Sequence, residues 1–355
     1  MLSRNLKLST IQHLQTSEQI RVIVIGSGAL GIELIKGILD SPETATVVGI
    51  LPVSNLPRYS FLRQHETEIA ISDLASSNQL KLLKAHSVNS DSFFHELREL
   101  KPHVLLVGGW GEIIQSPVLT IEDLAIINCH GSLLPKYRGA CPYFAPIFNG
   151  DNTTGLTFHL VDDGIDTGDI LLQKEFEVKT DETAIDLAKR TAIKFGQEIA
   201  SLIQKLKIGK IVPQQQTGVA SYVPEKKSEW GWIPWDYDAT IIAQRLRALN
   251  GFLPLATSID RLVIGFKSGK VVKQTSNSIA SLAGHLADAL LSEDGCIPGI
   301  VIRERTEHIL VSTRSPEHLV VLEKPMIVPT GHTAPKIRPG SQLISIECKG
   351  ILKSA

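Results

Sequence analysis

The side chains best suited to chemistry gather in two short segments of this chain. Asn128 and His130 follow the apolar run at residues 124–127, and Asp166 lies in the acidic turn at residues 162–169. Residues two apart on an extended chain point to the same side, so Asn128 and His130 should share one face. An amide, an imidazole and a carboxylate at strand ends can polarise a carbonyl and move a proton. Asn128, His130 and Asp166 are therefore the predicted catalytic residues.

Other interpretations of these residues have less support. A metal site could be built from His130, His159, Asp163 or Asp166, but the chain has no HExxH-type spacing, and we expect no metal. Cys129 should face the packed side of its strand, which disfavours it as a nucleophile. A purely structural role for the predicted catalytic residues is the remaining alternative.

Short Val/Ile/Leu runs alternate with helical patterns through the first part of the chain. This alternation is typical of an α/β fold with a mostly parallel sheet and helices on both faces. In such sheets ligands bind beyond the carboxyl ends of the strands, which is where the predicted catalytic residues lie. We expect strands at residues 21–25, 46–51, 104–107, 125–127, 157–161 and 170–178, and helices at residues 26–38, 90–100 and from an N-cap at Asp181 to residue 206.

The sequence Gly-Ser-Gly-Ala-Leu-Gly at residues 26–31 matches a dinucleotide-binding fingerprint. A nicotinamide enzyme also needs an acidic residue near the end of the second strand, to hold the ribose hydroxyls. Residues 49–54 contain no acid. The glycines are therefore better explained by a tight strand–helix turn than by NAD binding.

The pattern changes after the long helix. Residues 211–237 are rich in Gln, Pro, Trp, Ser and Lys without periodicity, and they are interpreted as a linker or wrapping segment. Residues 238–355 combine one helix with short β-branched strands, which suggests a small barrel or sandwich. The predicted division is a loose extension at residues 1–20, a catalytic domain at residues 21–210, the linker and a C-terminal domain. Within the last we expect a helix at residues 239–249 and strands at residues 261–266, 300–304, 309–312 and 319–322.

Composition favours a globular protein of two or more domains. Of 355 residues, 43% are hydrophobic and 21% charged, and 36 Lys and Arg balance 37 Asp and Glu. This balance gives no sign of a protein held to nucleic acid by bulk charge, although a local basic patch stays open. Four scattered cysteines fit a reducing compartment. No apolar run is long enough to span a membrane, so we expect a cytoplasmic protein, or a mitochondrial-matrix protein if residues 1–20 are a transit peptide.

Two motifs in the polar segments resemble one known family. Asn-x-His-x-Ser-Leu-Leu-Pro-x-x-Arg-Gly at residues 128–139 and Gly-x-Asp-Thr-Gly-Asp at residues 164–169 are similar to the signature of 10-formyltetrahydrofolate-dependent formyltransferases, among which methionyl-tRNA formyltransferases match best. The similarity is strongest at residues 104–178 and continues weakly through residues 230–235 and 247–250. It implies a Rossmann-like formyltransferase domain followed by a small β-barrel of the OB type.

The resemblance also implies roles for individual residues. Asn128, His130 and Asp166 match the family's catalytic trio, and 10-formyltetrahydrofolate is the implied formyl donor. Asn128 and an imidazolium at His130 would donate hydrogen bonds to the oxyanion that forms when a neutral amine attacks the formyl carbon. Asp166 would favour the protonated imidazole and guide a proton toward N10 of the folate. The residues implied to bind the folate are Ser132, Leu133, Leu134, Pro135, Gly109, Trp110, Gly111, Ile113, Val161, Asp163, Gly164 and Ile165.

The acceptor amine stays open between three interpretations. Whole-chain resemblance favours methionyl-tRNA, and the region from Asp236 onward, with 14 Lys and Arg against 11 Asp and Glu, is basic enough to contact tRNA. A small amine, such as a nucleotide-linked amino sugar or an amino acid, is the alternative, because residues 52–60 hold one Arg and no Gly where the tRNA enzymes carry a basic, glycine-containing loop. A relative that binds or hydrolyses 10-formyltetrahydrofolate without an acceptor is the third.

Overall fold

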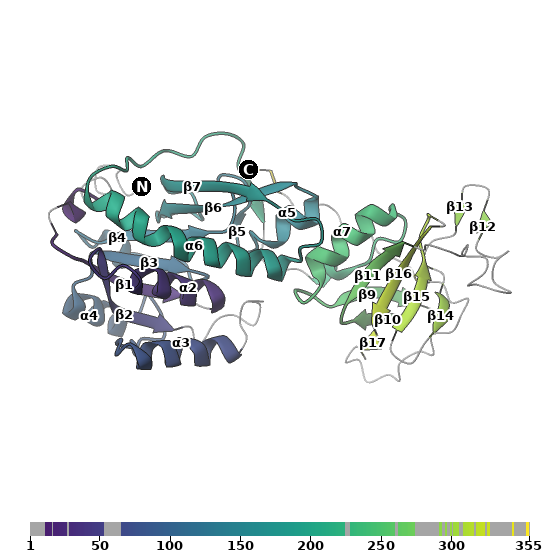
Figure 1. The fold of residues 1–355 in the computed structure, drawn as a ribbon, viewed down its shortest axis with the longest axis horizontal. Helices are drawn as coiled ribbons and strands as arrows, with labels where there is room; N and C mark the ends of the chain where they lie inside the picture. Colours follow the sequence, from purple (N-terminus) through teal and green to yellow (C-terminus); the bar gives the residue numbers. More distant parts are fainter. Residues whose placement is uncertain are drawn as a thin grey trace.

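The computed structural model describes residues 11–15, 17–26, 28–52, 65–223, 228–259 and 262–273, with shorter stretches at 291–292, 295–296, 299, 301–304, 308–315, 317–323, 325–326, 343 and 353–354. They form an α/β part and a smaller β-rich part at opposite ends of the long axis (Figure 1). Residues 52–60, where the chain differs from the basic, glycine-containing loop of the tRNA enzymes, lie outside the described residues except for Pro52. Within the described stretches, no helix has the length and apolar character needed to cross a membrane.

A six-stranded mixed sheet forms the centre of the α/β part, in the order β2-β1-β3-β4-β6-β7. The first four strands run parallel, β6 runs antiparallel to β4, and β7 runs antiparallel to β6. The predicted mostly parallel, Rossmann-like sheet is therefore confirmed, with one reversed strand. The strands are β1 Ile20–Gly26, β2 Ala45–Pro52, β3 Val104–Gly108, β4 Ala125–His130, β6 Thr153–Leu160 and β7 Ile170–Glu177.

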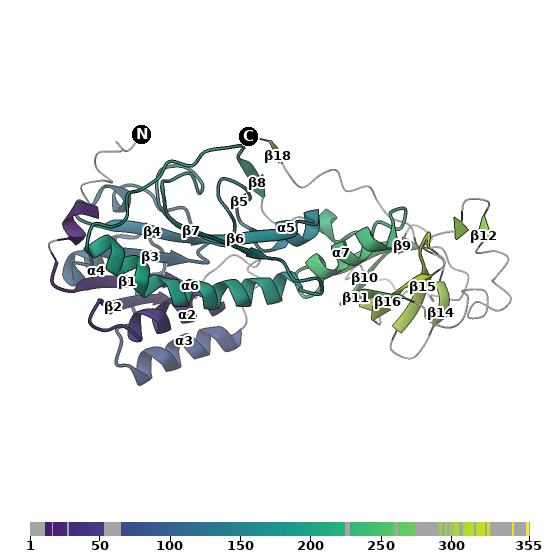
Figure 2. The same ribbon diagram turned by 45° about the horizontal axis from the view of Figure 1, so that its top comes forward.

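Alternating side chains on the central strands pack into two separate cores, one on each face of the sheet. Val22 and Val24 on β1 pack into a core with α2 and α6, whereas Ile23 and Ile25 pack on the opposite face, toward α4. Figure 2 shows α2 and α6 side by side along the sheet. Helices thus cover both faces, as a buried parallel sheet requires. Their bounds are α2 Gly28–Leu39, α3 His65–Ser77, α4 Asp91–Leu100 and α6 Ala184–Lys207.

The long helix α6 begins later than predicted. Its N-cap is Thr183, whose hydroxyl accepts the backbone N–H of Asp186 while the Asp186 carboxylate accepts the backbone N–H of Thr183. This reciprocal capping box satisfies two backbone donors that would otherwise lack a partner, and it outcompetes the predicted cap at Asp181.

The glycines of the dinucleotide-like pattern serve close packing. A Cβ atom on Gly26 would lie 2.9 Å from the Cα of Gly31 and 3.2 Å from the carbonyl oxygen of Gly108. The turn from β1 into α2 therefore leaves no room for a side chain, which supports the tight-turn explanation of the motif.

Part of the predicted loose extension is packed. Residues 11–14 are helical, and Ile11 and Leu14 are buried in the core between the sheet, α2 and α6. The prediction was wrong for these residues because two apolar side chains spaced three apart lie on one helical face, which the core covers.

The β-rich part contains α7 Ala239–Leu249, with the predicted bounds, and small antiparallel sheets. The four strands predicted there are found within one residue of their expected limits, while β9, β11, β12, β13 and β17 were not predicted. One sheet contains β9 Leu255–Ile259, β10 Leu262–Phe266 and β17 Pro325–Met326; another contains β11 Gly269–Lys273, β14 Val301–Glu304, β15 His308–Ser312 and β16 His318–Glu323; β12 Leu291–Ser292 and β13 Gly295–Cys296 form a hairpin.

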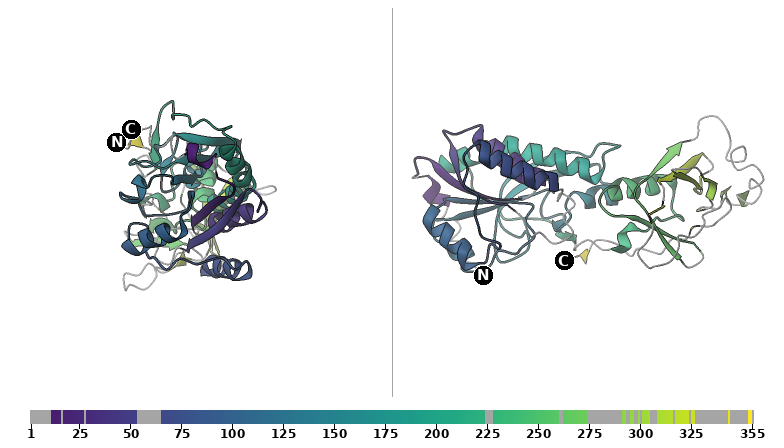
Figure 3. Two further views of the ribbon diagram at one scale, coloured as in Figure 1. Left: turned by 90° about the vertical axis from the view of Figure 1, so that its left-hand side faces the viewer. Right: turned by 90° about the horizontal axis from the view of Figure 1, so that it is seen from below.

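An aromatic core joins the two parts where they meet end to end (Figure 3). Phe144 of α5 (Phe144–Asn149) stacks between neighbours, with ring centroids 5.1 Å from Trp230 and 4.8 Å from Phe252. The same core includes Leu187 of α6 and Phe266 of β10. One continuous apolar core therefore contains side chains from the α/β part, the connecting segment and the β-rich part.

Candidate active site

Strand β4 carries two of the predicted catalytic residues. Asn128 and His130 are its third-last and last residues, so the strand continues three residues beyond its predicted end at residue 127. Asn128 lies opposite His159 of the antiparallel strand β6, in the register that also pairs His130 with Thr157. Between the two polar residues, Cys129 points into the core and is buried, as predicted. Burial also raises the pKa of its thiol well above the ordinary value, which disfavours the nucleophilic thiolate.

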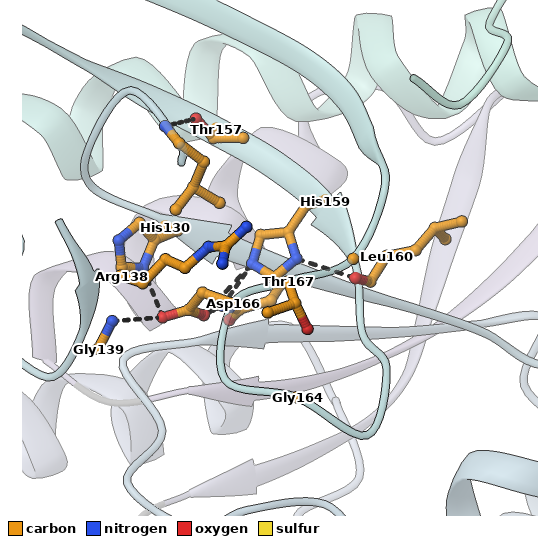
Figure 4. A network of polar contacts seen from close by, with 12 residues as sticks. His130, Arg138, Gly139, Thr157, His159, Leu160, Gly164, Asp166 and Thr167 are labelled. Atoms are coloured by element: carbon orange, nitrogen blue, oxygen red, sulfur yellow. Dashed lines mark hydrogen bonds and ion pairs between the residues drawn. The ribbon is translucent and has the colours of Figure 1, made fainter. Parts of the chain in front are cut away.

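Asp166 reaches this pair from the turn between β6 and β7 (Figure 4). Its Oδ1 accepts a hydrogen bond from Asn128 Nδ2 at 3.0 Å and lies 3.4 Å from His159 Nε2. Its Oδ2 lies 3.4 Å from His130 Nδ1 and accepts the backbone N–H of Gly139 at 2.7 Å. The three predicted catalytic residues, which come from two segments of the chain, therefore lie together, with Asn128 and His130 both beside the Asp166 carboxylate.

The hydrogen bonds define which ring nitrogens carry protons. His130 Nε2 lies 2.8 Å from the carbonyl oxygen of Tyr137, and His159 Nδ1 lies 2.9 Å from that of Leu160. A carbonyl only accepts, so both of these nitrogens donate. In the neutral rings, His130 Nδ1 and His159 Nε2 then carry lone pairs. His159 Nε2 accepts the second N–H of Asn128 at 3.1 Å, and His130 Nδ1 faces the carboxylate.

Burial governs the charges at the site. It lowers the pKa of His130 from the ordinary value, and the opposing attraction of Asp166 does not cancel it. The His130 side chain is 5% exposed, so the resting imidazole is neutral near pH 7. The imidazolium that is expected to contact the oxyanion would then form during the reaction. Burial also disfavours the charged form of Asp166, but His130, His159 and the Gly139 N–H outweigh it and hold the pKa of Asp166 below its ordinary value.

Several residues join the site that sequence reasoning did not assign to it. His159 was considered only as a metal ligand, yet it lies directly opposite Asn128. The Gly139 N–H, Arg138 and Gln216 also belong to the network around Asp166. A signal for His159 was present, because a histidine in a strand directly before the acidic turn must lie near any residue of that turn that folds back.

The segment at residues 132–135 folds as a compact loop directly after β4. Ser132 is fully buried, and its hydroxyl donates to the carbonyl oxygen of Lys136 at 2.5 Å. The Leu134 side chain is buried, and the Leu134–Pro135 peptide bond is cis. Gln173 Nε2 donates to the Leu134 carbonyl oxygen at 3.0 Å. The Ser132 hydroxyl therefore shapes the loop, and what remains for a ligand is backbone and apolar surface.

The two other predicted folate segments lie over one face of the sheet. Gly109, Trp110, Gly111 and Ile113 follow β3, whereas Val161, Asp163, Gly164 and Ile165 follow β6. Trp110 and Val161 both pack against the core on the α4 side. Ile113 and Ile165 are 62% and 52% exposed. The described residues contain no group of three or more His, Cys, Asp or Glu arranged to hold a metal ion.

Comparison with known proteins gives a consistent set of relatives. A family described as formyl transferase matches residues 18–203. The methionyl-tRNA formyltransferase of Caldanaerobacter subterraneus is 35% identical over 209 residues, which cover 58% of this chain and 68% of that protein. That of Methylacidiphilum infernorum is 31% identical over 291 residues, covering 77% of this chain and 89% of its own.

Solved structures share the fold. An N-formyltransferase from Helicobacter canadensis, in complex with folinic acid and dTDP-3-aminofucose, has a TM-score of 0.58 and 18% identity over 86% of this chain and 99% of its own. HypX from Aquifex aeolicus in complex with tetrahydrofolic acid has a TM-score of 0.56 and 11% identity over 87% of this chain and 46% of its own.

Proposed function

Because this chain belongs to the formyl transferase family and is a formyl-transferring enzyme, we propose that it formylates the amino group of methionyl-tRNA with 10-formyltetrahydrofolate as donor. The observation that supports this chemistry is that Asn128 and His130 both lie against the Asp166 carboxylate. The observation that favours this acceptor is the match to a methionyl-tRNA formyltransferase along 77% of the chain and 89% of the relative.

The reaction exchanges one carbon–nitrogen bond for another. The amine nitrogen forms a bond to the formyl carbon, the bond from that carbon to N10 breaks, the amine loses one proton, and N10 gains one. As the amine attacks, negative charge develops on the formyl oxygen. Asn128 Nδ2 supplies a donor for this oxyanion, exchanging its present acceptor on Asp166 or His159 for the formyl oxygen. Removing one donor of this kind costs roughly 3–4 kcal/mol of transition-state stabilisation.

His130 supplies the proton-transfer step. Its Nε2–H is held by the Tyr137 carbonyl oxygen, so the lone pair is on Nδ1, beside the carboxylate. Nδ1 accepts the proton of the attacking amine, and Asp166 Oδ2 at 3.4 Å stabilises the imidazolium that results. The imidazolium then stabilises the oxyanion and returns its proton to N10. The positive charge thus appears on His130 during the reaction rather than before it.

The folate is proposed to lie over the α4 side of the sheet's carboxyl edge. Two exposed apolar side chains, Ile113 and Ile165, provide surface for a flat ring system, and the backbones of both loops provide polar contacts. The proposed folate-binding residues remain Ser132 to Pro135 through their loop, Gly109, Trp110, Gly111, Ile113, Val161, Asp163, Gly164 and Ile165.

The finer assignments of the C-terminal part belong to the same proposal. We propose that residues 238–355 form a domain of the OB type after the catalytic domain at residues 21–210 and the segment at residues 211–237. Its excess of Lys and Arg is proposed to contact the phosphates of tRNA. The small antiparallel sheets found there are compatible with such a barrel. Activity on tRNA would place the protein in the cytoplasm or the mitochondrial matrix, where tRNA is charged.

A nucleotide-linked amino sugar is the second candidate acceptor, because residues 52–60 lack the glycines of the tRNA enzymes' loop. The deciding experiment incubates the protein with 10-formyltetrahydrofolate and either charged initiator tRNA or a panel of amino sugars. Formyl-methionine with tRNA alone supports the proposal. Formylated sugar without formyl-methionine contradicts the acceptor but keeps the chemistry, and tetrahydrofolate release with neither acceptor indicates a hydrolase.

The chemistry is tested by Asp166→Asn. Asp166 has a φ of 52°, in the left-handed region that Asn also adopts, so this change should preserve the fold. We expect kcat to fall roughly 10²–10⁴-fold, as for loss of an acid–base partner. Near-normal turnover by the folded variant would contradict the proposed role of the site.

A further inference from the structure

The segment after α6 does not leave the α/β part but crosses back over the site. Gln214 forms an isolated antiparallel bridge with Ile170, with N–O distances of 2.7 and 2.9 Å in the two directions. Further on, β8 (Ser221–Val223) pairs in parallel with β5 (Arg138–Gly139). The segment at residues 211–223 is therefore attached at Ile170, directly after the acidic turn, and at β5, and Gln216 lies between these two attachments in the chain.

Gln216 makes four hydrogen bonds through one amide group. Its Nε2 donates to the carbonyl oxygens of Asp166 and Gly168, both at 2.8 Å. Its Oε1 accepts from Arg138 Nε at 3.1 Å and from Nη2 at 2.7 Å. The amide can be oriented in only one way, because carbonyls accept and a guanidinium only donates. Gln216 thus ties the backbone of the turn to Arg138.

The Arg138 guanidinium donates its hydrogen bonds in this network to uncharged partners. Besides the Gln216 oxygen, its Nη1 donates to the Tyr222 hydroxyl at 2.9 Å, and its guanidinium lies 5.5 Å from the Tyr222 ring centroid. Tyr222 is the β8 residue paired with Arg138 across the two strands. Residues 211–223 therefore hold the guanidinium in place. The hydrogen bonds that connect Arg138 to the acidic turn run through the Gln216 amide.

The carboxylate end of Asp166 is held by the next residue of β5. The Gly139 N–H donates to Asp166 Oδ2 at 2.7 Å, and Gly139 pairs with Val223 of β8. The main chain of Asp166 is left-handed, a conformation that costs a non-glycine residue free energy and persists only when neighbours enforce it. The same segment thus acts on both ends of Asp166, through Gln216 on the backbone and through β8 and β5 on the carboxylate.

We propose that Gln216, oriented by Arg138, is a positioning residue for formyl transfer: its two donated hydrogen bonds hold the acidic turn so that the Asp166 carboxylate lies against His130 and Asn128. This inference rests on the proposed role of Asp166 in the reaction. Gln216 touches no reacting atom, so its loss should lower the rate of the chemical step and leave folate binding nearly unchanged.

Gln216→Glu and Gln216→Leu test the proposal in the full chain. Glu keeps the size and an acceptor for Arg138 but loses both donated hydrogen bonds, and Leu loses all four. The control is Gln215→Glu and Gln215→Leu, at the neighbouring exposed glutamine. We expect kcat to fall roughly 10–100-fold in both Gln216 variants, the range produced by small misplacement of a reacting group. The KM for 10-formyltetrahydrofolate should change less than about threefold, and the Gln215 variants should match the wild type.

Thermal melting of each variant separates positioning from unfolding. A Gln216 variant that stays folded at the assay temperature and shows an unchanged kcat overturns the proposal. A rise in KM at constant kcat also overturns it, because it would place Gln216 in ligand binding.

The path through Arg138 is tested by combining variants. If Arg138 acts through Gln216, Arg138→Met should lower kcat on its own but add little to Gln216→Leu, so the double variant should resemble Gln216→Leu. Arg138→Lys should retain more activity than Arg138→Met, since one donor to Oε1 remains. Additive losses would mean that Arg138 acts independently of Gln216, which contradicts the orienting role.

Asp166→Asn in the same assay keeps the two proposals distinguishable. An active Asp166→Asn variant removes the proposed role of Asp166 in the reaction, and this inference with it. An inactive Asp166→Asn variant beside fully active Gln216 variants removes this inference alone.

Discussion

The proposed catalytic residues on β4 and the proposed catalytic residue on the acidic turn are positioned in different ways. Asn128 and His130 are placed by strand register, with β3 on one side and β6 on the other. Asp166 lies on a turn with a left-handed main chain. Besides its contacts with Asn128 and the two histidines, it is held by the Gly139 N–H and by Gln216. Correct pairing of the sheet is therefore enough to place Asn128 and His130. The position of Asp166 depends in addition on side chains and strands from another region of the chain.

The largest expected effect comes from the strand side of this comparison. His130→Ala removes the proposed proton acceptor, so kcat should fall roughly 10²–10⁴-fold, as is usual for a lost general acid–base group. Cys129→Ala is the matched control on the same strand, because Cys129 points into the opposite core. It should lower the melting temperature slightly and keep near-normal turnover. A large activity loss in the control would mean that the strand as a whole, rather than the face bearing His130, determines the rate.

Asn128→Ala should have the next largest effect. It removes the proposed oxyanion donor, which corresponds to an expected loss of roughly 10²–10³-fold in kcat. It also leaves His159 Nε2 and Asp166 Oδ1 without their shared donor. Single-turnover measurements with saturating folate would locate the loss in the transfer step; a change confined to folate affinity would contradict the assignment.

Gly139→Ala tests the turn side of the comparison without touching a catalytic side chain. Gly139 has a φ of 100°, and a Cβ there would lie 2.4 Å from the carbonyl oxygen of Val223. The change should separate β5 from β8 and weaken the hydrogen bond to Asp166, with a cost of about 1–3 kcal/mol in stability. We expect kcat to fall about tenfold while the protein remains folded, measured beside a thermal melt. Unchanged kcat in a destabilised protein would show that the turn holds Asp166 without help from β5.

The smallest expected effect is in the pH profile. Burial lowers the pKa of His130, so its neutral, proton-accepting form persists below the ordinary histidine value of about 6.5. Once it is corrected for the ionisation of the acceptor amine, the plot of kcat/KM against pH should therefore stay flat through neutrality and fall only on the acid side of that value. The same shift makes stability fall as pH drops below about 6.5, because the unfolded chain then binds the proton more readily. An acid limb above pH 7 that survives this correction would contradict a neutral resting His130.

The difference between the two halves of the site also decides what could be predicted. Asn128 and His130 could be placed from the sequence, since strand periodicity and the parallel-sheet rule together specify a face and an edge. Asp166 could be identified by its motif, but its contact with Gly139 is a tertiary outcome that no local pattern encodes. Gln216 could not be identified, because it lies in a region without periodicity and its hydrogen bonds to backbone carbonyls do not affect the spacing of hydrophobic residues. The resting charge state of His130 could not be predicted either, because burial depth is a property of the folded core.

The aromatic core around Phe144, Trp230 and Phe252 has a consequence for how the chain unfolds and how it can be recombined. Its members come from three consecutive regions, so neither end of the molecule can lose its structure without uncovering the other's apolar surface. The molecule should then melt in one cooperative transition, and a chain cut after α6 should aggregate. An exchange of C-terminal parts between relatives would succeed only if the incoming part brought aromatic partners that fit Phe144.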